Sequence, residues 1–156
     1  MFQNLLKHPD SRLVGVDPWL SYEHHRKGMD QEFADQCYEN AQTNLNEWKS
    51  RVTLIRGMSQ NVLPDGLIKG SVGPVLVGKF DLAIIDGDHK AAAVLTDAMN
   101  CFDLLKKGGW MLFDDVRTSI AKKGQVKEGL EEFLKSYDEQ VKQVWSHRFC
   151  ECYEKL

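Results

Sequence analysis

Residues 80–89 read FDLAIIDGDH and residues 104–116 read LLKKGGWMLFDDV, and these two stretches indicate the fold class. In each, a nearly continuous apolar run ends on carboxylates, Asp86 in the first and Asp114-Asp115 in the second. Continuous apolar runs of this length are typical of strands covered on both faces, as in parallel sheets. The segment between them has the apolar spacing of an amphipathic helix that ends at Gly108-Gly109, a common C-terminal signal. Together they predict a strand–helix–strand unit of a parallel α/β sheet.

The same alternation continues outside this unit. Strand patterns occupy residues 12–17, 51–56, 80–86 and 110–116, and helical patterns occupy residues 33–48, 62–69, 94–105 and 126–137. Residues 141–145 and 147–153 have the pattern of two antiparallel strands at the C-terminal end. We expect Trp110, which begins a buried strand, to lie in the core. The pattern predicts one α/β domain over residues 1–156.

Composition excludes several classes of protein. The 156 residues carry a net charge of −3, which favours neither nucleic-acid phosphates nor an anionic membrane surface. No run approaches the ~18 apolar residues of a membrane span, and the first ten residues do not have the pattern of a secretory signal. The four cysteines are scattered without a Cys-x-x-Cys pair, which favours reduced thiols. We therefore expect a soluble cytoplasmic domain without nucleic-acid or membrane partners.

Three of the four expected parallel strands end on carboxylates, where α/β sheets bind their ligands. If the strands before Asp86 and Asp114-Asp115 are neighbours, three carboxylates converge. Like charges at that distance repel unless a cation or a proton intervenes, and Mg²⁺ prefers oxygen ligands. The alternative is that one aspartate caps the following helix while the others face solvent.

Two further residues allow two interpretations each. His89 follows Asp86 in the turn before a helix, where an imidazole is either a general base or a solvated capping residue. Asp17 closes the strand at residues 12–17, where a carboxylate either accepts hydrogen bonds from a ribose diol or caps a turn with Pro18. Spacing alone decides neither case.

Several of these segments resemble the motifs of a known family. Residues 80–89, the helix after them and residues 104–116 resemble the later motifs of class I S-adenosylmethionine-dependent methyltransferases, in particular the branch that includes metal-dependent sugar and macrolide O-methyltransferases. Residues 12–19 (RLVGVDPW) resemble the second strand of that family, and residues 56–59 resemble its segment beside the adenine. The resemblance covers roughly residues 5–116. It implies a Rossmann-like, mostly parallel sheet flanked by helices, with an antiparallel strand pair at the C-terminal end.

The resemblance also implies roles for individual residues. Asp86, Asp114 and Asp115 would bind Mg²⁺ or another divalent cation, and His89 would deprotonate a substrate hydroxyl. Residues that would contact the S-adenosylmethionine are Asp17, Gly57, Met58, Ser59 and Asp86. The implied reaction is in-line transfer of the sulfonium methyl group to an oxygen, in which holding the two reactants in line supplies much of the rate gain.

One departure from the family concerns the start of the chain. The family has a first strand and a glycine-rich loop before the region where this sequence begins, and residues 1–7 (MFQNLLK) already resemble the end of the following helix. Three explanations compete: a fragment truncated at the N-terminus, which we favour, a rearranged or self-associated sheet, or a degenerate relative. We expect impaired cofactor binding by this chain, since glycine suits close approach of a cofactor to the backbone.

The leading functional hypothesis is therefore an O-methyltransferase that acts on a hydroxyl of a small molecule, such as a sugar. The alternative is a non-catalytic methyltransferase-like domain that serves as a binding or assembly module. A nicotinamide-binding domain would need a Gly-x-Gly-x-x-Gly motif before Asp17 and leaves Asp114-Asp115 unexplained. The sequence identifies neither the acceptor nor the oligomeric state, although a gap in the sheet would favour a homo-oligomer.

Overall fold

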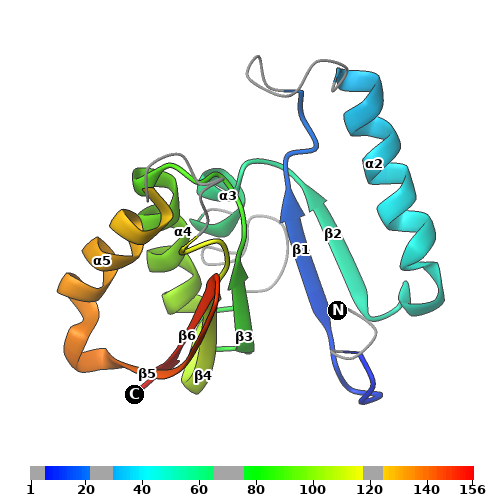
Figure 1. Ribbon diagram of the computed structural model, residues 1–156. Coiled ribbons are helices and arrows are strands. Elements are labelled where there is room, and N and C mark those ends of the chain that lie inside the picture. Colours follow the sequence, from blue (N-terminus) through cyan, green and yellow to red (C-terminus); the bar gives the residue numbers. More distant parts are fainter. Residues whose placement is uncertain (1–5, 22–29, 65–75, 118–124) are drawn as a thin grey trace. The chain divides into compact units, whose positions relative to one another are not determined.

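The computed structural model describes residues 6–21, 30–64, 76–117 and 125–156 (Figure 1). The chain divides into two compact units, residues 1–59 and residues 60–156, and each is described by itself. Both alternate strands with helices, which confirms the expected α/β class. The described helices include none with the length and apolar character that a membrane span requires.

The first unit is built on two parallel strands. β1 (Leu13–Asp17) pairs in parallel with β2 (Val52–Arg56), and α2 (Gln31–Asn44) and the 3-10 helix η1 (Asn46–Trp48) lie between them in the sequence. The carboxylate of Asp30 caps α2 by accepting a hydrogen bond from the N–H of Phe33 at 2.9 Å. No side chain of α2 is buried, and Leu6 is the one buried hydrophobic residue among the described residues of this unit.

The second unit contains a four-stranded sheet in the order β3-β4-β6-β5. β3 (Phe80–Ile85) and β4 (Leu105–Phe113) are parallel neighbours, while β6 (Cys150–Lys155) runs antiparallel to both β4 and β5 (Val141–His147). The helices of this unit are α4 (Ala91–Leu104), α5 (Gln125–Tyr137) and the 3-10 helix η4 (Asp138–Gln140). The expected antiparallel strand pair is confirmed, with His147 in the first strand of the pair rather than the second.

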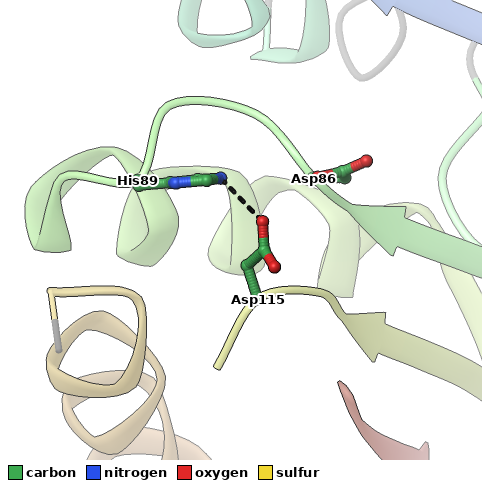
Figure 2. A group of neighbouring side chains, drawn as sticks. All are labelled: Asp86, His89 and Asp115. Carbon is green, nitrogen blue, oxygen red and sulfur yellow. Dashed lines mark ion pairs between the residues drawn. The ribbon is translucent and has the colours of Figure 1, made fainter. Parts of the chain in front are cut away.

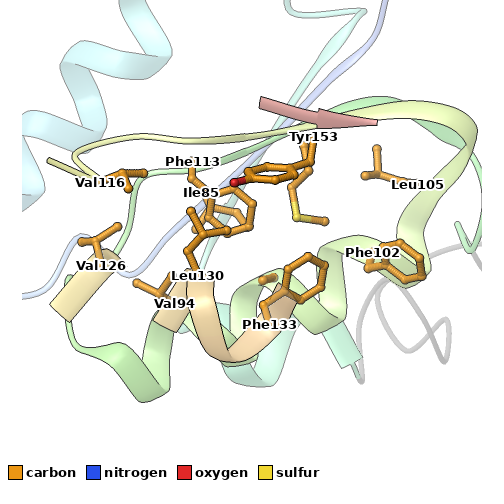
Figure 3. Close-up of a cluster of buried hydrophobic side chains, with 12 residues drawn as sticks. Ile85, Val94, Phe102, Leu105, Phe113, Val116, Val126, Leu130, Phe133 and Tyr153 are labelled. Atoms are coloured by element: carbon orange, nitrogen blue, oxygen red, sulfur yellow. The ribbon is translucent and has the colours of Figure 1, made fainter. Parts of the chain in front are cut away.

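A continuous hydrophobic core holds α4 and α5 against one face of this sheet (Figure 3). Phe113 of β4 and Phe133 of α5 are fully buried, with ring centroids 5.9 Å apart. At Gly129 of α5 the two helices are so close that an added Cβ would lie 2.5 Å from the carbonyl oxygen of Ala91. At the C-terminal end of β6, the ammonium of Lys155 donates hydrogen bonds to the carbonyls of Phe102 and Leu105, where α4 ends.

Two expectations about the segment before Asp114 are wrong. The helix ends at Leu104 rather than at Gly108-Gly109, because Leu105 is buried and already pairs with Phe80 of β3. Residues 106–109 then bulge out of the ladder, with Gly108 at φ +77°, before Trp110 pairs with Leu82. Trp110 is 52% exposed, since successive strand residues face opposite sides and its neighbour Met111 takes the side covered by the helices.

Two other helix boundaries also differ from the expectation. The first expected helix, at residues 33–48, is divided into α2 and η1. A short helix, α3 (Ser59–Asn61), precedes the expected helix at 62–69, of which residues 65–69 lie outside the described residues.

Candidate active site

The chemically active side chains of the second unit follow two neighbouring strands. Asp86 comes directly after β3, and Asp114 and Asp115 come directly after β4. Because β3 and β4 are parallel, their carboxyl ends meet at one edge of the sheet, where the N–H of Asp114 donates to the carbonyl of Ile85 at 3.1 Å. His89 reaches the same edge from the turn between β3 and α4.

Three of these side chains form a compact acidic group. Asp86, His89 and Asp115 each offer one ligand atom, and these atoms all lie within 4.8 Å of one another. Figure 2 shows the imidazole of His89 facing the carboxylate of Asp115, with Asp86 at the end of β3 beside them. The Nε2 atom of His89 lies 3.5 Å from Oδ2 of Asp115, and both side chains are about one-third exposed, so the group is open to solvent.

The backbone at Asp115 has the left-handed conformation that directs this carboxylate. Asp115 has φ +57°, a region that aspartate tolerates better than most other residues. Its N–H donates to Oδ1 of Asp114 at 2.8 Å, which stabilises the turn locally. The two consecutive aspartates thus differ in their contacts: the carboxylate of Asp114 stabilises the turn through Oδ1, and that of Asp115 faces His89.

Asp114 lies beside the group of three rather than within it. Its Oδ1 atom also accepts a hydrogen bond from the thiol of Cys150, at 2.8 Å. Sequence reasoning missed this contact. No local sequence signal gives this contact, because it depends on the register of β4 with β6, which sets Phe113 opposite Glu151 and so brings residue 150 to residue 114.

The negative charges at this edge affect one another. Burial, and then the charges of Asp114 and Asp115, raise the pKa of Asp86 above its ordinary value, while His89 opposes the shift. Burial and the hydrogen bond to Asp114 raise the pKa of Cys150 to about 11, so its thiol stays protonated at neutral pH. A bound cation, like a proton, relieves the repulsion between crowded carboxylates, so such a group favours cation binding. Carboxylate oxygens suit a hard divalent ion such as Mg²⁺ or Mn²⁺.

The first unit holds the other predicted site residues. Asp17 is exposed at the end of β1, and its Oδ1 accepts a hydrogen bond from the N–H of Trp19 at 2.6 Å. Oδ1 of Asp17 therefore caps the turn, as one of the two interpretations predicted. Gly57 follows β2 and donates its N–H to the carbonyl of Asp17 at 3.0 Å, and Met58 and Ser59 come next in the chain. The structure thus places Gly57 beside Asp17.

A polar network that the sequence did not reveal fixes the loop after Asp17. Arg56 forms an ion pair with Asp35 of α2 and donates to the carbonyl of Trp19 at 2.8 Å. Gln31 donates to the same carbonyl at 3.1 Å and to Asp35 at 2.8 Å. Trp19 has φ +42°, and these contacts from α2 and β2 hold a backbone conformation that is otherwise uncommon.

Comparison with known proteins identifies the family. A family model described as a methyltransferase domain matches residues 1–116, about three-quarters of the chain. The chain belongs to this family. The match spans both β1 with Asp17 and the strand ends that carry Asp86, Asp114 and Asp115. A search of curated proteins finds no match.

Solved structures share the fold of this methyltransferase-domain chain at low sequence identity. CalS11, a TDP-rhamnose 3′-O-methyltransferase, has a TM-score of 0.56 and 14% identity, with 95% of this chain and 60% of CalS11 covered. MycE, in complex with Mg, S-adenosylhomocysteine and mycinamycin VI, has a TM-score of 0.55 and 16% identity, with 93% and 44% covered. A putative rRNA methylase from Clostridium thermocellum has a TM-score of 0.58 and 22% identity, with 93% and 73% covered.

These likenesses confirm the class I methyltransferase fold, which is Rossmann-like, as expected from the sequence. The chain spans less than two-thirds of the length of CalS11 and of MycE. At identities this low the shared fold leaves the acceptor open, because the three relatives have names that point to different substrates.

Proposed function

We propose that this methyltransferase-domain chain binds S-adenosylmethionine and transfers its methyl group to a hydroxyl of a small molecule. The observation that carries the proposal is the convergence of Asp86, His89 and Asp115 within 4.8 Å at the edge where β3 and β4 end. An acidic group with an imidazole provides both a cation site and a base, which are the two requirements for activating a hydroxyl.

His89 is the proposed general base. Imidazole accepts protons readily at neutral pH, and the carboxylate of Asp115 at 3.5 Å stabilises the imidazolium that forms. In the proposed step the acceptor O–H proton passes to His89, a C–O bond forms to the methyl carbon, and the C–S bond of the sulfonium breaks. S-adenosylhomocysteine leaves with the electron pair of that bond.

Asp86, Asp114 and Asp115 are the proposed ligands of Mg²⁺ or a similar divalent cation. The fit is supported by the donor set and by the raised pKa of Asp86, whose ionised form is disfavoured by burial and then by the charges of Asp114 and Asp115. When bound, such a cation withdraws charge from an acceptor hydroxyl and so makes its proton easier to remove.

The proposed cofactor contacts are Asp17, Gly57, Met58, Ser59 and Asp86. Asp17 is exposed at the end of a parallel strand, the usual position of a carboxylate that binds a ribose diol. Its carbonyl is already engaged by Gly57, so the strand end is fixed before any ligand arrives. This preorganisation supports the proposal, because fewer groups need to be ordered on binding.

The acceptor we favour is a sugar hydroxyl. CalS11 is named for a sugar substrate, TDP-rhamnose, and MycE was solved with mycinamycin VI. The Clostridium relative is described as a putative rRNA methylase, yet the net charge of −3 on this chain disfavours binding to RNA phosphates.

Calorimetric titration with S-adenosylhomocysteine, with and without Mg²⁺, tests the cofactor part. We expect saturable binding, weaker than in a methyltransferase that has the glycine-rich loop. Asp17→Ala should weaken it further by at least about tenfold, the loss that follows from about 1.4 kcal/mol of ribose contacts. A turnover assay with a panel of nucleotide sugars tests the reaction, and His89→Ala should reduce the rate by about 10²- to 10⁴-fold. Binding without turnover on any acceptor would favour the non-catalytic module, and absence of binding would refute the proposal.

A further inference from the structure

We propose that Cys150 is a positioning residue for Asp114. Its thiol would set the orientation in which this carboxylate serves the acidic group formed by Asp86, His89 and Asp115. The inference rests on the proposed function, in which Asp114 is one of the cation ligands. It adds a residue from β6 to a site otherwise built from the ends of β3 and β4.

The backbone fixes where the thiol lies. β4 and β6 pair antiparallel with Leu112 opposite Cys152 and Phe113 opposite Glu151, so continuing the ladder brings Cys150 to Asp114. Just beyond, the N–H of Val116 donates to the carbonyl of Phe149 at 2.7 Å. Backbone hydrogen bonds thus join the two segments on both sides of the thiol–carboxylate contact, so the backbone holds the two side chains close together.

Both hydrogen bonds to the Asp114 carboxylate go to the same oxygen. Oδ1 accepts from the thiol of Cys150 and from the N–H of Asp115, each at 2.8 Å. Among contacts between described residues, Oδ2 accepts none. Two donors on one oxygen hold the carboxylate in one rotamer and leave the second oxygen for a cation.

A thiol is chemically suited to this task. It is a neutral and weak donor, so it orients the carboxylate while leaving most of its negative charge for the cation. A lysine or arginine in the same place would neutralise Asp114 and compete with the cation. Outer partners of ligating side chains typically contribute 10- to 100-fold in metal affinity.

The same contact extends to Asp115. Because Oδ1 of Asp114 also holds the N–H of Asp115, whose φ is +57°, the rotamer of Asp114 and the turn at Asp115 depend on each other. Removing the thiol therefore loosens two of the proposed ligands. The effect should appear in cation binding even when overall stability is unchanged.

Direct binding of Mn²⁺ to the 156-residue chain tests the proposal without cofactor or acceptor. Free Mn²⁺ is measured by electron paramagnetic resonance, and Mg²⁺ is added as competitor. We expect Cys150→Ala to weaken Mn²⁺ affinity about tenfold and Cys150→Ser, which keeps a donor, to stay within about threefold of wild type. The matched control is Cys152→Ala, the next thiol on the same face of β6, which is buried beside Leu112. It should lower Tm and leave Mn²⁺ affinity unchanged.

Wild-type affinity or tighter binding in Cys150→Ala would overturn the positioning role, and so would a loss in Cys152→Ala equal to that in Cys150→Ala. If Cys150→Ala does not fold, Cys150→Val takes its place with the same expectation. A wild-type chain that binds no Mn²⁺ refutes this role and the cation site together. If the expected order of affinities holds but no acceptor is methylated, the positioning role stands and the proposed reaction fails.

Discussion

Different interactions stabilise each of the two units of the chain. Residues 60–156 contain a cluster of buried side chains from two helices and three strands, including Phe113 and Phe133, both fully buried. Residues 1–59 contain one buried hydrophobic residue among those described, Leu6, and α2 buries none of its side chains. What fixes the end of β1 is a polar network around Arg56 and Asp35.

This difference indicates which parts of the chain tolerate substitution. The acidic group stands on a packed sheet, whose hydrophobic core contributes most of the stability. The loop after Asp17 depends on exposed hydrogen bonds and an ion pair, each worth little in water and sensitive to salt. The proposed base and cation ligands are therefore mechanically better supported than the proposed ribose ligand.

Truncating one phenylalanine in each unit gives the largest contrast. Phe133→Ala removes a fully buried ring and should cost about 3–5 kcal/mol of unfolding free energy. Phe33→Ala removes a ring that is 43% exposed on α2 and should cost less than about 1 kcal/mol. Urea unfolding followed by circular dichroism measures both. Equal costs would mean that the first unit has a core comparable to that of the second.

Adding a methyl group at two glycines sharpens the comparison. Gly129→Ala sets a Cβ 2.5 Å from the backbone oxygen of Ala91, and the clash should outweigh the gain of about 1 kcal/mol in helix propensity. We expect a net loss of about 1–3 kcal/mol. Gly15→Ala in β1 meets only the tip of the Leu54 side chain, at 2.9 Å, which can move. Gly15→Ala is the control, and a loss of unfolding free energy as large as that in Gly129→Ala would contradict the explanation by a backbone clash.

Neutralising one carboxylate of the acidic group should stabilise the cation-free chain. The pKa of Asp86 is raised in the fold, so its favourable contribution is present at pH below 3.8 and is lost as the pH rises through the folded value. Asp86→Asn should therefore raise Tm at pH 7 in EDTA by about 1–3 °C, with the gain disappearing in acid. It should also abolish Mn²⁺ binding.

The control for this variant lies two residues further along the chain. Asp88→Asn loses an ion pair with Lys90 at 3.2 Å and should lower Tm slightly. A rise in Tm for Asp88→Asn as large as that for Asp86→Asn would contradict the explanation by crowding of the acidic group.

The smallest expected effect has the opposite sign and belongs to the first unit. Hydrogen bonds from Arg56 and then Gln31 lower the pKa of Asp35, so its contribution to stability is present above pH 3.8 and is lost as the pH falls through the folded value. Asp35→Asn should lower Tm at pH 7 slightly and leave it unchanged at pH 2. High salt should reduce the difference, because the pair is partly exposed. A salt-independent loss would argue against an electrostatic origin.

The sequence predicted what depends on local pattern. Strands that end on Asp17, Asp86 and Asp114 follow from apolar runs that stop at carboxylates, and the meeting of the last two follows from parallel pairing. The helix boundary at Gly108-Gly109 was wrong because the burial of Leu105 against β3 overrode the glycine signal. Trp110 was placed in the core because periodicity identifies a strand but does not say that one face of it lacks a cover.

Contacts between distant segments were beyond such reasoning. Cys150 and Asp114 are 36 residues apart, and their meeting depends on the register of an antiparallel pair that no local signal fixes. The contact of Arg56 with Trp19 depends in the same way on how β2 and the loop after β1 are placed. Both networks use polar side chains whose sequence positions have no period.

The order β3-β4-β6-β5 also determines when the second unit can fold during synthesis. β6 is the last of the four strands to leave the ribosome, yet it lies in the interior of the sheet, between β4 and β5. β5 therefore cannot join the sheet before β6 has emerged. The nascent sheet therefore has an open edge at β4, where other chains can add, until residue 155 has emerged from the exit tunnel. Slow translation should thus lengthen the time during which this edge is open to other chains, compared with a sheet whose strands pair in order.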